Sequence, residues 1–226
     1  MKMVAAALLA LALSGWGAAQ GTLVDNCAYP KPQATAVTFG SLQGALLGHG
    51  PRGVLLSNDS GNGVCEWITL AQHLVKRGFA VLTYTYASPY PTDNRAADLH
   101  AALSALRRQG VRDVTLVGAS QGANLSLQAA SERLLGVTGV VALSPEAHVL
   151  ATAGDPTRPF AQNLRVRALF VTASDDPYDA NTAAPALYGA APVRDKRLIT
   201  VQGMAHGTEL LRDPKVLQRV VDFITK

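Results

Sequence analysis

The sequence contains few cysteines and few charged residues, and each scarcity excludes a class of protein. Two cysteines in 226 residues are too few for a disulfide-built scaffold, and they do not have the spacing of a zinc site. Charged residues make up 16% and hydrophobic residues 48%, so the chain can bury a large core and is not intrinsically disordered. The 20 Lys and Arg residues form no basic block, which argues against a nucleic-acid partner because phosphate binding needs clustered charge.

Residues 1–19 have the three-part layout of an export signal. Lys2 precedes an unbroken apolar run of ten residues, and small residues follow just before Gln20. The run is about half the length that a membrane span needs, so we expect cleavage before Gln20 and no stable membrane insertion. The mature domain would then comprise residues 20–226, in the periplasm or outside the cell. The alternative is that residues 1–19 form an Ala/Leu-rich first helix of the fold.

Export changes what the two cysteines imply. Cys27 and Cys65 both remain after cleavage, and two lone thiols often pair in an oxidising compartment. A Cys27–Cys65 disulfide would tether the N-terminal segment to the domain and contribute about 3–4 kcal/mol in the chain-entropy model. The alternative is a pair of small buried side chains that never meet.

Apolar runs alternate with helical periodicities along the rest of the chain. We expect strands at residues 54–56, 79–86, 114–117, 137–143, 168–172 and 197–201. We expect helices at residues 67–75, from 92 or 93 to 106, and at 121–135, 181–188 and 213–224. Strands separated by single helices imply right-handed crossovers. The predicted class is therefore α/β, with a mainly parallel, doubly wound sheet that helices cover on both faces, in a single domain.

A possible nucleophile lies between an expected strand and an expected helix. Residues 118–122 read Gly-Ala-Ser-Gln-Gly, which matches the Gly-x-Ser-x-Gly nucleophile elbow. The turn is sharp and strained, and bulky side chains two residues from the serine would clash in it. It would lift the Ser120 hydroxyl clear of the sheet. The alternative is a serine that only caps a helix, and this predicts no catalytic partners downstream.

Such partners are present in the loops after two later strands. Asp175 and Asp176 follow the strand at 168–172, and His206 follows the strand at 197–201 between two glycines. The remaining histidines lack this setting and are expected at the surface, at positions 49, 73, 100 and 148.

The order Ser, Asp, His, each after a strand, resembles the α/β-hydrolase superfamily over essentially the whole mature chain. The resemblance is closest to compact dienelactone-hydrolase-like and esterase-like members with a minimal lid or none. It implies that Ser120 attacks an acyl carbon, that His206 carries the proton, and that an acyl-enzyme forms. The family's acid lies three residues after a Gly-like position, here Ala173, which favours Asp176 over Asp175 as the residue that orients the histidine. No cofactor and no metal ion is expected.

The resemblance also locates two backbone donors for an oxyanion. One is the N–H of Gln121, and the other belongs to the loop after the strand at 54–56. By position this second donor is the N–H of Asp59, with Asn58 as the alternative. Many relatives carry His-Gly there, whereas a carboxylate at Asp59 would repel an oxyanion and must point away or pair elsewhere.

The expected substrate is a small-molecule or polymer ester. The segment between the strands at 137–143 and 168–172 is short and contains three prolines, which favours an open site. Aromatic side chains either line an acyl pocket or belong to ordinary packing, at Trp67, Tyr86, Tyr90 and Tyr178. A serine peptidase or amidase, or a non-catalytic binding protein on the same scaffold, are the alternative functions. The sequence sets no oligomeric state.

Overall fold

The computed structural model describes residues 34–61, 63–88, 95–148 and 156–226. The expected signal at 1–19 lies outside these residues, as do Cys27, Tyr90 and the helix cap expected at Thr92 or Asp93. Cleavage before Gln20 therefore stays a prediction, and so does the Cys27–Cys65 disulfide, although Cys65 itself is described.

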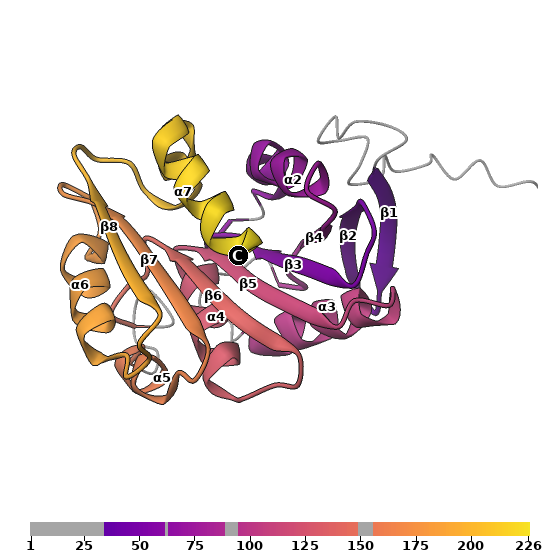
Figure 1. Cartoon of the computed structure of the whole chain (residues 1–226), viewed down its shortest axis with the longest axis horizontal. Coiled ribbons are helices and arrows are strands. Elements are labelled where there is room, and N and C mark those ends of the chain that lie inside the picture. The colour runs from indigo at the N-terminus through magenta and orange to yellow at the C-terminus, as the bar shows by residue number, and fades with distance from the viewer. Residues whose placement is uncertain (1–33, 62, 89–94, 149–155) are drawn as a thin grey trace, which may run out of the picture.

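The described residues form one sheet of eight strands in the order β1-β2-β4-β3-β5-β6-β7-β8 (Figure 1). The strands are β1 (Ala34–Phe39), β2 (Leu42–Leu47), β3 (Arg52–Ser57), β4 (Ala80–Tyr84), β5 (Asp113–Ala119), β6 (Val137–Leu143), β7 (Arg167–Ala173) and β8 (Lys196–Val201). Strands β1, β2 and β4 pair antiparallel, and every other neighbouring pair is parallel. The predicted mainly parallel α/β fold is confirmed.

The helices are η1 (Val64–Trp67), α2 (Ile68–Val75), α3 (Ala96–Arg108), α4 (Gln121–Ser131), α5 (Arg158–Asn163), α6 (Ala180–Ala190), η2 (Gly207–Arg212) and α7 (Pro214–Thr225). All six expected strands are present as β3 to β8, and all five expected helices are present. Helix α4 ends at Ser131 rather than Leu135, because Arg133 takes a left-handed conformation with φ 57°. The antiparallel β1–β2 pair and α5 were not predicted.

Helices cover both faces of the sheet, as expected. Helices α2 and α7 lie together on one face, and α3, α4, α5 and α6 cover the other (Figure 1). Successive residues of β3 alternate between the two cores: Val54 packs with residues of α2 and α7, whereas Leu55 packs with residues of α3 and α4. This alternation buries each parallel strand on both sides, which explains the continuous apolar runs in the sequence.

The chain order places a switch point between β3 and β5. From β3 the chain crosses to β4 on one side, then returns to β5 on the other side. In open sheets of this kind, ligands bind in the crevice outside the carboxyl ends of the strands at the switch point. The loops after β3 and β5 are therefore held next to each other at that edge.

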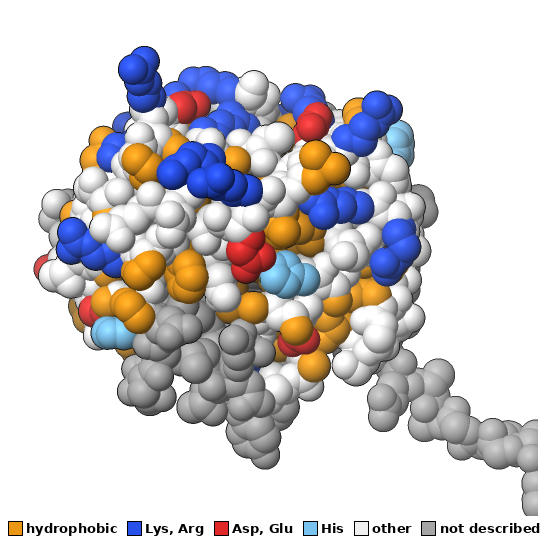
Figure 2. Space-filling model, turned by 90° about the horizontal axis from the view of Figure 1, so that it is seen from below, with side chains coloured by type: hydrophobic (Ala, Val, Ile, Leu, Met, Phe, Trp, Pro, Cys, Tyr) orange, Lys and Arg blue, Asp and Glu red, His pale blue; other side chains and the backbone are white. Residues whose placement is uncertain are grey.

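No helix within the described ranges is both long and apolar enough to cross a membrane. On the face that Figure 2 shows, Lys and Arg side chains are spaced among other side chains rather than gathered into one block.

Candidate active site

Ser120 occupies the sharp turn between β5 and α4. Its backbone has φ 53° and ψ −120°, a strained conformation for a residue with a side chain. The flanking glycines make the turn possible: a Cβ at Gly118 would overlap the carbonyl oxygen of Gly122, and a Cβ at Gly122 would overlap that of Asn58. The clash predicted for bulky residues at these two positions is therefore confirmed.

The Ser120 hydroxyl does not cap the helix that follows it. No side-chain hydrogen bond from Ser120 reaches the first turn of α4. The hydroxyl instead donates a hydrogen bond to Oε1 of Glu146, 2.9 Å away. The helix-capping alternative for Ser120 is wrong for this structure, and the hydroxyl is directed toward other polar side chains.

Asp176 and His206 form a close pair at the ends of β7 and β8. The Nδ1 of His206 lies 2.9 Å from Oδ1 and 3.0 Å from Oδ2 of Asp176. Asp176 is buried, whereas Asp175 is exposed and accepts a hydrogen bond from Ser174. The structure thus brings Asp176, and not Asp175, to the histidine. A carboxylate at Nδ1 keeps the proton on that nitrogen and leaves Nε2 as the acceptor.

Two further donors hold the Asp176 carboxylate. The hydroxyl of Ser144 donates to Oδ2 at 2.8 Å, and the backbone N–H of Tyr178 donates to Oδ1 at 3.1 Å. Ser144 is buried after β6, and it also accepts the N–H of Gly207 at 2.9 Å. One hydroxyl therefore ties together the loops that carry Asp176 and His206.

Glu146 is a site residue that the sequence interpretation missed. It follows β6, and its Oε1 lies 2.9 Å from the Ser120 hydroxyl and 3.9 Å from Nε2 of His206. Burial raises the pKa of Glu146 from 4.5, and the hydrogen bond from Ser120 opposes this shift. The signal that pointed to Asp176, an acid directly past a strand, was present here too, because Pro145 and Glu146 follow the strand at 137–143.

The two predicted oxyanion residues lie near each other and near Ser120. Asp59 and Gln121 both line the cavity that contains the nucleophile. The Asp59 carboxylate accepts the N–H of Gly61 at 2.9 Å, so it pairs within its own loop as the sequence required. Asn58, the alternative donor, has its side chain buried between Trp67 and Tyr84, with hydrogen bonds of 2.8 and 2.6 Å.

A buried arginine links the loop after β3 to the start of α4. Arg95 donates from Nη1 to the backbone carbonyl of Ser60 at 2.9 Å and to Oε1 of Gln121 at 2.8 Å. Its guanidinium also lies over the ring of Tyr86, 4.2 Å from the centroid. The sequence interpretation missed Arg95 because it precedes α3 and belongs to no strand-end pattern. The same contact shows that the Gln121 side chain is held in place.

The cavity at this edge has a volume of about 380 Å³. Its lining comprises Asp59, Ser60, Ser120, Gln121, Glu146, His148, Tyr178, Asp179 and His206. Of the aromatic candidates, Trp67 and Tyr86 are buried packing residues, whereas Tyr178 is 62% exposed and contacts the His206 ring in a tilted arrangement, with centroids 4.5 Å apart. His148 is at the surface as expected, yet it borders the cavity.

The described residues contain no group of three or more His, Cys, Asp or Glu side chains arranged to hold a metal ion. What the site does hold is a strained serine, a histidine–carboxylate pair and two adjacent backbone turns. This set can perform acyl transfer by nucleophilic attack, with the histidine as the proton carrier.

No protein-family model matches the sequence, and no curated protein sequence matches it. Solved structures do match. An esterase from Pyrococcus furiosus aligns with a TM-score of 0.71 at 13% identity, over 91% of this chain and 95% of that one. An enol-lactonase from Burkholderia xenovorans LB400 aligns with a TM-score of 0.69 at 15% identity, over 85% of this chain and 100% of that one. A dienelactone hydrolase from Anabaena variabilis aligns with a TM-score of 0.66 at 19% identity, over 87% of this chain and 96% of that one.

These likenesses establish the α/β-hydrolase fold. The resemblance inferred from the sequence is confirmed at this level, and it includes the dienelactone-hydrolase-like and esterase-like structures that the motifs favoured. At such low identities the fold alone is shared, so the activity must be argued from the site.

Proposed function

We propose that the protein is a serine hydrolase that cleaves carboxylic esters through Ser120, His206 and Asp176. The observation that carries the proposal is the strained Ser120 in one cavity with the hydrogen-bonded His206–Asp176 pair. The three residues come from three different strand ends, so their meeting is a property of the fold and not of one local segment. The esterase and lactonase among the matching structures support the ester-cleaving assignment.

The reaction would begin with a change of hydrogen-bond partner at Ser120. The hydroxyl turns from Glu146 to Nε2 of His206, which takes the proton as Oγ forms a bond to the acyl carbon. Asp176 stabilises the resulting imidazolium. The oxyanion lies between the N–H groups of Gln121 and Asp59, whose loops Arg95 holds together.

The second half of the cycle reverses these roles. His206 returns the proton to the alcohol as it leaves, and a water molecule then attacks the acyl-enzyme. His206 takes a proton from this water and gives it to Oγ of Ser120 as the bond between Oγ and the acyl carbon breaks and the carboxylic acid departs. Each proton transfer uses Nε2 of His206, so Asp176 must keep Nδ1 protonated throughout.

The test compares wild type with Ser120→Ala and uses Ser131→Ala, on the same helix but away from the cavity, as a control. We expect wild type and Ser131→Ala to bind a fluorophosphonate probe covalently and to hydrolyse p-nitrophenyl acetate. Ser120→Ala should show neither. Activity that survives in Ser120→Ala would remove Ser120 from the mechanism, and a wild type that neither labels nor hydrolyses any short ester would refute the proposal. A matched p-nitroanilide series distinguishes an amidase.

We also propose that the protein is exported and carries the Cys27–Cys65 disulfide. The export-signal layout of residues 1–19 supports this, and so does the exposed position of Cys65 in η1. Expression of the full chain in a bacterial host should yield a product in the periplasm or medium that starts at Gln20. Its intact mass should increase by about 2 Da on reduction. A cytosolic product that retains Met1 would contradict the proposal.

A further inference from the structure

Glu146 contacts both side chains that must exchange a proton. Its Oε1 accepts the Ser120 hydroxyl at 2.9 Å and lies 3.9 Å from Nε2 of His206. In this structure the nucleophile therefore hydrogen-bonds a carboxylate rather than its base. For the reaction to start, this hydrogen bond must break, so whatever engages Glu146 controls the nucleophile.

The position of Glu146 is built into the fold. Its backbone N–H donates to Oδ1 of Asn124 at 3.0 Å, and Nδ2 of Asn124 donates to the carbonyl of His148 at 2.6 Å. The N–H of Ala147 donates to Oδ2 of Asp179 at 3.1 Å. Asn124 is fully buried on α4, and its side chain hydrogen-bonds to both ends of the segment 146–148. The Glu146 side chain is only 14% exposed, so the atoms packed around it hold the carboxylate at the cavity wall.

No lysine or arginine in the described cavity lining neutralises the negative charge of Glu146. Burial raises its pKa, the hydrogen bond from Ser120 and the charge of a protonated His206 lower it, and the negative charges of Asp179 and Asp176 raise it again, with a net increase. While His206 acts as a base it is neutral and does not offset the Glu146 charge. The described residues that line the cavity include no Lys or Arg. Arg95, a buried arginine at the same edge of the sheet, donates hydrogen bonds to Gln121 and to the carbonyl of Ser60.

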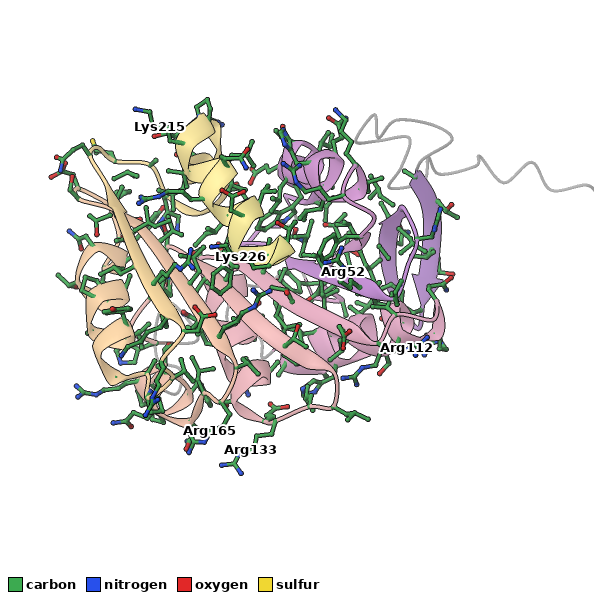
Figure 3. The ribbon with its side chains drawn as sticks, viewed as in Figure 1. Arg52, Arg112, Arg133, Arg165, Lys215 and Lys226 are labelled. Atoms are coloured by element: carbon green, nitrogen blue, oxygen red, sulfur yellow. The ribbon has the colours of Figure 1, made fainter. Side chains whose placement is uncertain are left out.

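The Lys and Arg side chains that Figure 3 labels lie outside the cavity lining, with Lys215 and Lys226 at the two ends of α7. Figure 3 labels Arg52, Arg112, Arg133 and Arg165, which begin β3 or lie in the connections that lead into β5, β6 and β7. These are the amino ends of the parallel strands, opposite the edge that carries the cavity. Among the described residues no basic side chain at the cavity complements Glu146, which leaves this role to a substrate.

We propose that Glu146 makes the site selective for esters that carry a positive charge near the scissile carbonyl. A substrate cation pairs with the Glu146 carboxylate and replaces the Ser120 hydroxyl there, which releases the hydroxyl to donate to His206. Binding of the correct charge and activation of the nucleophile are thus one event. This inference rests on the proposed esterase function and adds the substrate class to it.

The test uses two substrates of the same shape that differ in charge: acetylthiocholine and its uncharged isostere 3,3-dimethylbutyl thioacetate. Thiol release gives kcat/KM for wild type, Glu146→Gln, Glu146→Asp and the control Glu132→Gln, an exposed glutamate paired with His100. We expect wild type to favour the cationic ester by about tenfold or more, since a partly buried charge pair is poorly screened. Glu146→Gln should show a preference of about twofold or less, and Glu146→Asp and Glu132→Gln should retain most of it.

The neutral ester separates the possible failures. If wild type cleaves it through Ser120 without favouring the cation, or if Glu146→Gln keeps the preference, the inference about Glu146 is wrong and the esterase function stands. If wild type cleaves neither ester and does not label with fluorophosphonate, both are wrong. Turnover of the neutral ester by Glu146→Gln, at any measurable rate, shows that this variant is folded, and Glu132→Gln gives the reference for unchanged turnover.

Discussion

Two loops at the same edge of the sheet each place a carboxylate beside His206, and the two carboxylates differ in burial and in the number of hydrogen-bond donors that hold them. Asp176, after β7, is buried and accepts hydrogen bonds from His206, Ser144 and the N–H of Tyr178. Glu146, after β6, borders the cavity and accepts its side-chain hydrogen bond from Ser120. A carboxylate with several fixed donors stays in one arrangement throughout a reaction. One that is bound to a single rotatable hydroxyl can exchange that partner for a ligand.

The largest difference should be seen when each carboxylate becomes an amide. Asp176→Asn removes the acceptor that keeps the proton on Nδ1 of His206, and kcat for p-nitrophenyl acetate should fall by about 10³–10⁴-fold. Glu146→Gln keeps the shape of the side chain and leaves the His206–Asp176 pair intact, so kcat for this neutral ester should change by less than about tenfold. Equal losses in the two variants would show that the carboxylates have the same role.

The residues that support each carboxylate offer a second, smaller test. Ser144→Ala removes one donor from Asp176 and one acceptor from Gly207, and kcat should fall by about tenfold for charged and neutral esters alike, with a loss of about 1–2 kcal/mol in stability. Asn124→Ala frees the segment that carries Glu146 and should instead reduce the preference for the cationic ester. Steady-state kinetics on the matched thioesters and urea unfolding measure both effects. A uniform loss of kcat in Asn124→Ala would mean that it supports the whole site.

The smallest expected effect concerns stability and pH. Because the folded protein raises the pKa of Glu146 above 4.5, the folded state binds this proton more tightly than the unfolded chain does. Ionised Glu146 therefore lowers the free energy of unfolding. This cost is absent below the ordinary pKa of a glutamate, grows as the pH rises from that pKa to the raised pKa, and is complete above the raised pKa. Glu146→Gln should thus melt about 2 °C above wild type at pH 7, with the gap closed at pH 4.

The control for this experiment is Glu132→Gln, because the exposed Glu132 pairs with His100 outside the cavity. Its melting temperature should fall or stay unchanged at pH 7, since exposed ion pairs contribute little. Differential scanning calorimetry at both pH values gives the comparison. A Glu146→Gln variant that melts below wild type at pH 7 would mean that the ionised carboxylate stabilises the fold.

How much could be predicted from the sequence depended on how local each feature is. The turn at Ser120 depends on two glycines and a strand–helix boundary within a few residues, so its geometry was predicted correctly. The buried strands β3 to β8 were predicted because burial on both faces makes them continuously apolar. The edge strand β1 was missed because half of its surface is open and its pattern is weak, with only Phe39 buried.

Glu146 and Arg95 show the limit of such arguments. Both are single charged residues in irregular segments. Glu146 follows a strand, as Asp176 does, but no family pattern singles out either Glu146 or Arg95. Their partners, Ser120 for one and Gln121 with Ser60 for the other, lie far away along the chain. Asp176 differed in this respect, because a family pattern singled it out from Asp175.

Local sequence alone establishes the α/β alternation, the turn that presents Ser120 and the loops that hold Asp176 and His206, because hydrophobic period and turn sterics act over a few residues. The tertiary structure decides which of these groups meet. It pairs His206 with Asp176, directs the Ser120 hydroxyl to Glu146 and buries Arg95 against Ser60 and Gln121. The reason is the parallel sheet itself: it brings the ends of strands that are distant in the chain to one edge, where charge, burial and hydrogen bonding between segments set the chemistry.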